Sequence, residues 1–144
     1  MNKEKIITDT LIPKNRLVDD LATLGVEPND MLFVHSSLKS IGPVDGGAAT
    51  MVATLEQAIA PEGLLLMPSF NLVDKDKRAS TWNIATTPST VGYLTEFFRL
   101  MPGTVQSDHY SHSVAARGKD ASGFVSGHLL KEGLVAPWDR EPWG

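Results

Sequence analysis

The chain has 144 residues, of which 42% are apolar, and its 13 basic and 17 acidic residues give a formal net charge of −4. This length predicts one domain with a buried core, and an acidic balance without a cluster of basic residues argues against nucleic acid as a partner. Cysteine is absent, which excludes a disulfide framework and a thiolate site, and no apolar stretch of signal-peptide or membrane-span length occurs, so we expect a cytoplasmic protein.

Four elements are predicted in the first half of the chain. Apolar residues at helical spacing predict a short amphipathic helix over residues 15–24. Residues 31–34 form a continuous apolar run of strand length, and we expect both faces of this strand to be buried. Residues 48–60 carry the clearest apolar stripe of a helix, and residues 64–67 form a second apolar strand.

Strand, helix and strand in this order are typical of a βαβ unit, in which the two strands are parallel and the crossover is right-handed. The strands are apolar throughout, as expected where helices cover both faces of a parallel sheet. We therefore predict an α/β fold with a βαβ-based, mostly parallel sheet and flanking helices.

The second half of the chain is less regular. Residues 68–88 show no sustained period and are expected to form a long surface excursion, a length that usually indicates function or mobility. A helix is predicted over residues 87–101, a strand over 113–116 and a helix over 121–130, whereas residues 133–144 look irregular.

Polar residues and glycines follow the first strand. In LFVHSSLKSIGPVDGG the apolar run changes to His35, Ser36 and Ser37, and Gly46 and Gly47 precede the next helix. Ligands of parallel sheets bind outside the carboxyl ends of the strands, and a helix N-terminus suits a phosphate or pyrophosphate. The alternative is that the serines cap a turn and the glycines relieve strain before the helix. Spacing alone leaves both open, because the stretch is neither a GxGxxG nor a Walker loop.

Five segments together resemble the aminoglycoside N3-acetyltransferase family, whose members transfer an acetyl group from acetyl-CoA to an amine. They are, in chain order, LFVHSSLKSIGPVDGGAAT, APEGLLLMPSF, TPSTVGYLTEFFR, MPGTVQSDHYSHSVAARG and SGHLLKEG. The resemblance implies an α/β fold with a CoA groove, acetyl-CoA as cosubstrate without a metal, and acetylation of the 3-amino group of an aminoglycoside antibiotic, which confers resistance.

The resemblance also assigns residues to the CoA groove. It places the loop from His35 through Ser36 to Ser37, and Ser89 in the TPS segment, where hydroxyl and backbone groups would contact pantetheine or phosphate. Gly46 and Gly47 would let the backbone approach the ligand closely. For Ser89, a plain helix N-cap is an equally good interpretation.

SDHYSHS is the second group of candidate site residues. Acetylation of an amine needs a base that titrates near neutral pH, and we expect His109 to be that base. The alternative is a structural histidine that is hydrogen-bonded within a loop, which is the favoured interpretation for His112 and His128. A metal site of Asp108, His109 and His112 is a weaker alternative, because no HExxH or CxxC pattern is present and strand-like alternation would send residues three apart to opposite faces.

Two departures from the family pattern follow. Gln106 and Tyr110 stand where the family's RS-x-HP pattern has arginine and proline, so an anion contact at position 106 does not carry over. Family chains continue into a second half, so we expect residues 1–144 to be a single α/β domain that forms the N-terminal portion of an acetyltransferase domain. We further expect little or no turnover, and self-association through exposed core surface. A non-catalytic CoA-binding or partner-binding remnant is the alternative function.

Overall fold

A computed structural model of the chain describes residues 11–35, 37–73 and 75–127. Its strands are β1 (Met31–Phe33), β2 (Leu64–Pro68), β3 (Val105–Gln106) and β4 (Val114–Gly118). Its helices are α2 (Lys14–Thr23), α3 (Leu38–Ile41), α4 (Gly47–Ile59), α5 (Arg78–Thr81), α6 (Tyr93–Leu100) and α7 (Ala121–Val125), with a 3₁₀ turn, η1 (Lys75–Lys77), before α5.

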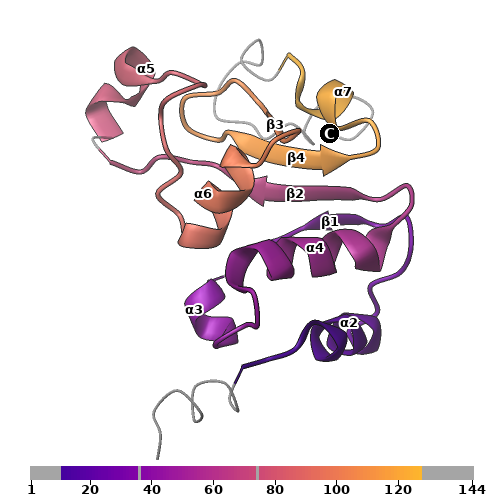
Figure 1. The fold of residues 1–144 in the computed structure, drawn as a ribbon. Coiled ribbons are helices and arrows are strands. Elements are labelled where there is room, and N and C mark those ends of the chain that lie inside the picture. Colours follow the sequence, from indigo (N-terminus) through magenta and orange to yellow (C-terminus); the bar gives the residue numbers. More distant parts are fainter. Residues whose placement is uncertain (1–10, 36, 74, 128–144) are drawn as a thin grey trace, which may run out of the picture.

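One four-stranded sheet in the order β1-β2-β4-β3 forms the centre of the molecule (Figure 1). β1 and β2 are parallel and are joined through α4, which confirms the βαβ unit and the α/β class. β4 is antiparallel to both β2 and β3, so the expectation of a mostly parallel sheet is wrong. The physical reason is the short connection between β3 and β4, because a parallel pair would need a crossover of about a dozen residues or more.

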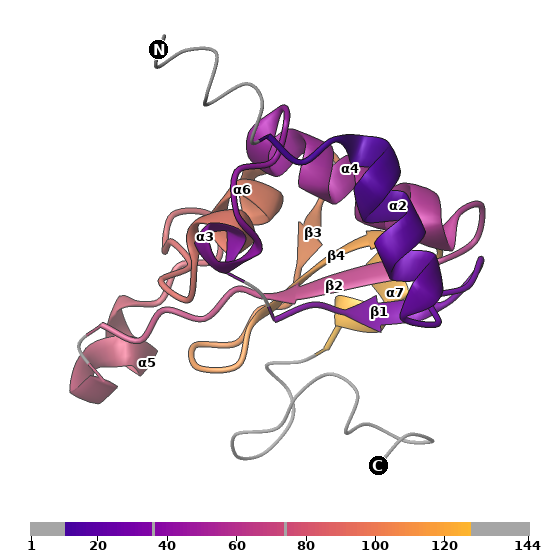
Figure 2. The same ribbon diagram turned by 90° about the horizontal axis from the view of Figure 1, so that it is seen from below.

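Helices cover both faces of the sheet. α4 and α6 lie on one face, where Leu65 and Met67 of β2 pack in one core with Phe98 of α6, and α2 packs on the side of α4 that faces away from the sheet (Figure 1 and Figure 2). Leu64 and Leu66 point to the other face, which α7 covers. This alternation explains why every residue of β2 is buried, as the apolar sequence predicts.

The first strand differs from the expectation. β1 lies at the edge of the described sheet, with β2 as its one neighbouring strand in that part of the chain. Its residue Met31 is 45% exposed. The prediction that both faces of this strand are buried is therefore wrong, because an apolar run alone does not distinguish a central strand from an edge strand.

The predicted helix bounds are most accurate for the two helices that carry a clear apolar stripe. The helices expected over 15–24 and 48–60 are confirmed to within a residue at each end as α2 and α4. The helix expected over 87–101 begins only at Tyr93, after Gly92 with φ 138°. The helix expected over 121–130 ends at Val125; residues 128–130, like the tail at 133–144, lie outside the described residues. Within the described ranges, no helix is long and apolar enough to cross a membrane.

Candidate functional site at the carboxyl edge of the sheet

Three loops meet at one edge of the sheet. The parallel strands β1 and β2 end there, at Phe33 and Pro68, and His35 and Ser69 follow them. β4 starts there because Val114 pairs with Pro68 in the antiparallel register. The loop 107–113, which joins β3 to β4, therefore lies at the same edge, and so does the N-terminus of α4 (Figure 1). We call this region the carboxyl edge.

Buried hydroxyl groups fix the base of the loop 107–113. The Ser69 and Ser113 hydroxyl oxygens are 2.9 Å apart, and Gln106 Nε2 donates to both, at 3.2 and 2.9 Å. Ser113 Oγ also donates to the Ser107 carbonyl at 2.6 Å, and the Val114 N–H donates to Ser107 Oγ at 2.8 Å. Such a satisfied buried network costs little and gives the loop one defined shape. Gln106, where the family pattern has arginine, thus serves this network.

His109 is held inside the loop. Its side chain is 1% exposed, and its Nδ1 accepts hydrogen bonds from the backbone N–H groups of Ser111 at 3.2 Å and His112 at 3.0 Å. A ring nitrogen that accepts two N–H donors carries no proton, so the neutral ring has its hydrogen on Nε2. In this geometry the Nδ1 lone pair of His109 is occupied, whereas a general base would need a free lone pair.

His112 lies beside His109, with ring centroids 5.8 Å apart. The expectation that residues three apart point to opposite faces is wrong here, because residues 110–112 form a turn. His112 is half-buried against Phe70, and its Nδ1 is 2.8 Å from Ser111 Oγ. Among the described residues, no hydrogen-bond partner reaches its Nε2. If Nδ1–H donates to Ser111, the Nε2 lone pair is available to take a proton.

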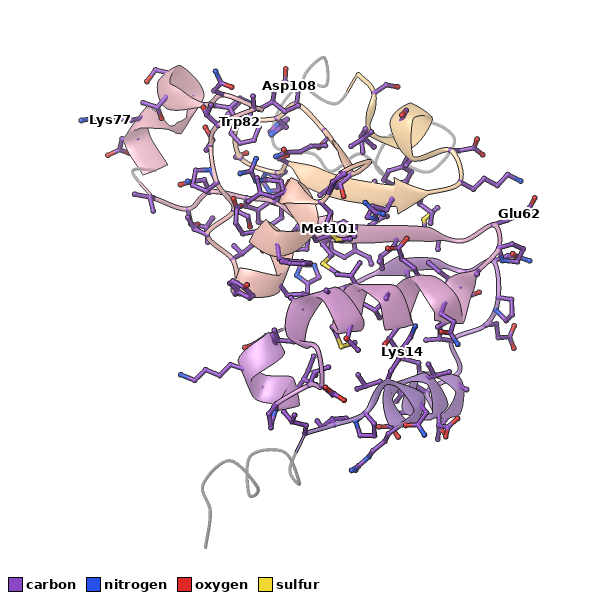
Figure 3. All side chains as sticks on the ribbon, viewed as in Figure 1. Lys14, Glu62, Lys77, Trp82, Met101 and Asp108 are labelled. Carbon is purple, nitrogen blue, oxygen red and sulfur yellow. The ribbon has the colours of Figure 1, made fainter. Side chains whose placement is uncertain are left out.

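The metal alternative finds no support in the geometry. No group of three or more His, Asp or Glu side chains in the described part of the chain is placed to hold a metal ion. Asp108 Oδ1 instead accepts from the Trp82 indole N–H at 2.7 Å, and the two side chains lie next to each other in Figure 3. His109 Nδ1 is occupied by backbone donors.

The loop after β1 presents polar groups of different kinds. His35 is exposed, with its ring centroid 4.5 Å from that of Phe33. Ser37 is exposed and is the N-cap of α3, where its hydroxyl accepts from the Ser40 N–H at 3.3 Å. Ser36 lies outside the described residues. The capping interpretation of Ser37 is therefore correct, and a long capping bond still leaves its hydroxyl able to donate to a ligand.

Gly46 and Gly47 open α4 in left-handed backbone geometry, with φ values of 88° and 64°. A Cβ at Gly46 would overlap Thr50 Oγ1, whereas one at Gly47 would meet open space. Strain relief before the helix is thus correct for both. No side chain caps the start of α4, although the Gly47 N–H donates to the Val44 carbonyl at 2.9 Å. The N–H groups that follow Gly47 and the positive end of the helix dipole are therefore what the start of α4 offers to an anion.

Ser89 is placed differently from the other predicted site residues. It is 7% exposed; its N–H donates to Glu96 Oε2 at 2.6 Å and its hydroxyl is 2.8 Å from that of Thr95. The N-cap of α6 is Gly92, so the N-cap interpretation of Ser89 is wrong. Burial alone would raise the pKa of Glu96, but the Arg99 and Ser89 hydrogen bonds and the Arg99 charge lower it below its ordinary value.

A second cleft, of about 310 Å³, lies at the opposite edge of the sheet, where α4 ends. Its Glu56 carboxylate pairs with Arg117 at 3.2 Å, and Arg117 also donates to the Pro102 carbonyl at 2.7 Å. The negative end of the α4 dipole lies at this edge, which disfavours a phosphate. The carboxyl edge is therefore the better anion site.

The comparison with known proteins decides the family. The model of the aminoglycoside 3-N-acetyltransferase family matches residues 33–140. The chain belongs to this family. It is 31% identical to the SPbeta prophage-derived aminoglycoside N(3')-acetyltransferase-like protein YokD of Bacillus subtilis, over 91% of the chain and 56% of that protein. It is 34% identical to an aminoglycoside N(3)-acetyltransferase III from Salmonella sp, over 83% and 49%.

Solved structures of aminoglycoside acetyltransferases share the fold. AAC-VIa bound to sisomicin matches with a TM-score of 0.73 and 32% identity, over 83% of this chain and 50% of that one. The binary complex of AAC-IIIb with CoASH matches with a TM-score of 0.71 and 26% identity, over 83% and 51%. The chain spans about half the length of the curated relatives that it matches.

Sequence reasoning missed one part of the carboxyl edge. Trp82 and Tyr110 line a cleft with Asp108 beside the histidines, and the sequence did not predict either aromatic residue as part of a site. The available signal was a large aromatic residue with a polar indole N–H inside a polar excursion, because tryptophan commonly lies where one end of the side chain is apolar and the other meets a polar partner.

Proposed function

We propose that the chain acts in acetyl transfer from acetyl-CoA to the 3-amino group of an aminoglycoside antibiotic, and so confers resistance. The observation that carries the proposal is the convergence of the uncapped N-terminus of α4, the end of β1 and the two histidines at one edge of the sheet in a member of this family. An anion site next to proton-transferring side chains is the arrangement that a CoA thioester and an amine require.

CoA would be bound by the loop after β1. The first turn of α4 after Gly47 supplies backbone N–H groups for a phosphate, Gly46 and Gly47 let the ligand approach the backbone closely, and His35 and Ser37 supply exposed polar side chains. Ser36 remains part of the proposed loop. The Ser89 hydroxyl is directed to Thr95, so any contact of Ser89 with CoA would need that hydroxyl to turn. A CoA complex of the neighbour AAC-IIIb supports this cosubstrate.

The chemistry requires one proton to be moved. The amine nitrogen attacks the thioester carbonyl carbon, the C–S bond breaks, and the amine proton passes through a base to the leaving thiolate. His109 remains the proposed site histidine, and its geometry favours donation from Nε2. His112 is the histidine whose Nε2 has no partner among the described residues, so we assign the base role to His112, whereas His109 keeps its proposed catalytic place as a proton donor.

Three further proposals complete the assignment. Residues 1–144 form the N-terminal portion of an acetyltransferase domain, which the half-length coverage of relatives supports. The absence of cysteine supports a cytoplasmic location. Self-association would use the apolar pocket of about 220 Å³ lined by Met31, Phe33, Leu66 and Phe124; concentration-dependent mass in light scattering tests it.

The test of the proposed function is a thiol-release assay with acetyl-CoA and sisomicin, run on the chain beside YokD. Release that depends on both substrates, with acetylated sisomicin detected by mass spectrometry, supports the enzyme. Saturable CoA binding without transfer supports the alternative, a non-catalytic CoA-binding protein. Absence of both CoA binding and transfer overturns the proposal.

A further inference from the structure

A second feature of the carboxyl edge is a cleft of about 420 Å³ between the 68–88 excursion and the histidine loop. It is lined by Ala79, Trp82, Asn83, Ile84, Asp108 and Tyr110. Figure 3 shows Trp82 and Asp108 together beside α5, with the indole N–H donating to Asp108 Oδ1 at 2.7 Å. We call it the Trp82 cleft.

The chemistry of the Trp82 cleft suits a cation. Asp108 is exposed, and no Lys or Arg side chain forms an ion pair with it among the described residues. The indole N–H fixes one carboxylate oxygen, which leaves the other oxygen and the negative charge for a ligand. Trp82 and Tyr110 add aromatic surface, which attracts ammonium groups. A phosphate would be repelled by the same carboxylate.

The cleft also adjoins the histidines. The Tyr110 ring stacks on His109, with centroids 5.0 Å apart and an interplanar angle of 14°. His109 in turn lies beside His112. A ligand in the Trp82 cleft would therefore sit one aromatic ring away from the side chains proposed to move the proton.

We propose that the Trp82 cleft binds a protonated amino group of the acceptor, one other than the amine that becomes acetylated. This inference rests on the proposed function. An ammonium group paired with a carboxylate keeps its proton, and a protonated amine has no lone pair for attack on the thioester. Asp108 thus orients the acceptor through a second, non-reacting amine, which makes the site selective for acceptors with at least two amino groups.

The test is calorimetric titration of the full chain with sisomicin and, separately, with CoA. Asp108→Asn removes the charge but keeps an oxygen that can accept from Trp82, so the loop should stay intact. Asp19→Asn, at an exposed carboxylate on α2, is the matched control for non-specific attraction of a polycation. A charge-assisted contact at an exposed site predicts a sisomicin Kd about fivefold to tenfold higher in Asp108→Asn. CoA affinity should not change, and Asp19→Asn should leave both affinities unchanged.

Four outcomes would overturn the inference. The first three are no sisomicin binding by the wild-type chain, a similar Kd in wild type and Asp108→Asn, and an equal loss in Asp19→Asn. A loss of CoA affinity in Asp108→Asn would assign the cleft to the cosubstrate and would also overturn it. The proposed function is tested separately by CoA binding and thiol release, so acetyl transfer with an unchanged Asp108→Asn Kd would reject this inference alone.

Discussion

Removing the His109 ring should destabilise the chain more than removing a surface histidine, because its Nδ1 is the acceptor for two backbone donors. His109 is 1% exposed, and the N–H groups of Ser111 and His112 reach it at 3.2 and 3.0 Å. A buried donor left without a partner costs about 1–3 kcal/mol, and the lost packing adds to this. Water entering the loop recovers part of the loss, so we expect His109→Ala to lower the free energy of unfolding by about 2–4 kcal/mol.

The matched variants separate the acceptor from the ring. Asparagine places an oxygen close to the position of Nδ1, whereas glutamine places its amide near Nε2, so His109→Asn should recover about half of the loss and His109→Gln little. Urea unfolding followed by circular dichroism measures all three, with His35→Ala at an exposed position as control. A loss below about 1 kcal/mol in His109→Ala, or a glutamine variant more stable than the asparagine variant, would refute the acceptor role of Nδ1.

Two further predictions concern the glycines at the start of α4 and the ion pair between Glu96 and Arg99 in α6. Gly46→Ala and Gly47→Ala both incur the left-handed penalty of about 1–2 kcal/mol, but Gly46→Ala should destabilise the chain more because its Cβ would overlap Thr50 Oγ1. In thermal unfolding, adding Thr50→Ala to Gly46→Ala should remove that excess. Equal destabilisation by the two glycine substitutions would contradict the prediction. The pKa of Glu96 is lowered from 4.5 chiefly by Arg99, against the opposing effect of burial. Its ion pair therefore stabilises the fold above that pH and is lost as pH falls through the lower folded value. Wild type should lose stability more steeply than Glu96→Gln between about pH 5 and 3, and parallel curves would contradict this.

Much of the fold follows from the sequence because short-range patterns fix it. The stripe of α4 and the two apolar strands around it are local signals, and they identify the βαβ unit directly. The orientation of β4 is not local, since it depends on which neighbour the strand pairs with after a seven-residue loop. The predicted start of α6 is too early, because a serine before an apolar stripe is the usual sequence signal of a helix N-cap. In the structure Ser89 instead bonds to Thr95 and Glu96 of the helix from outside it.

The candidate site was only partly predictable for a similar reason. The polar loop after β1 can be identified from sequence because strand ends bind ligands in parallel sheets. The state of His109 depends on the turn at 110–112, which brings two backbone N–H groups onto one ring nitrogen. The Trp82 cleft joins residues 26 positions apart in the chain, and no periodicity indicates such a contact.

The central claim is that CoA binds at the carboxyl edge of the sheet, against the N-terminus of α4. Titration of the ¹⁵N-labelled chain with CoA, followed by amide chemical shifts, tests it residue by residue. We expect saturable shifts of the Ser37, Gly47 and Ala48 amides, and weaker saturation when Gly47→Glu places a negative charge beside the phosphate. Shifts confined to the opposite cleft around Gln57 and Arg117, or no saturable shift at all, would contradict the account.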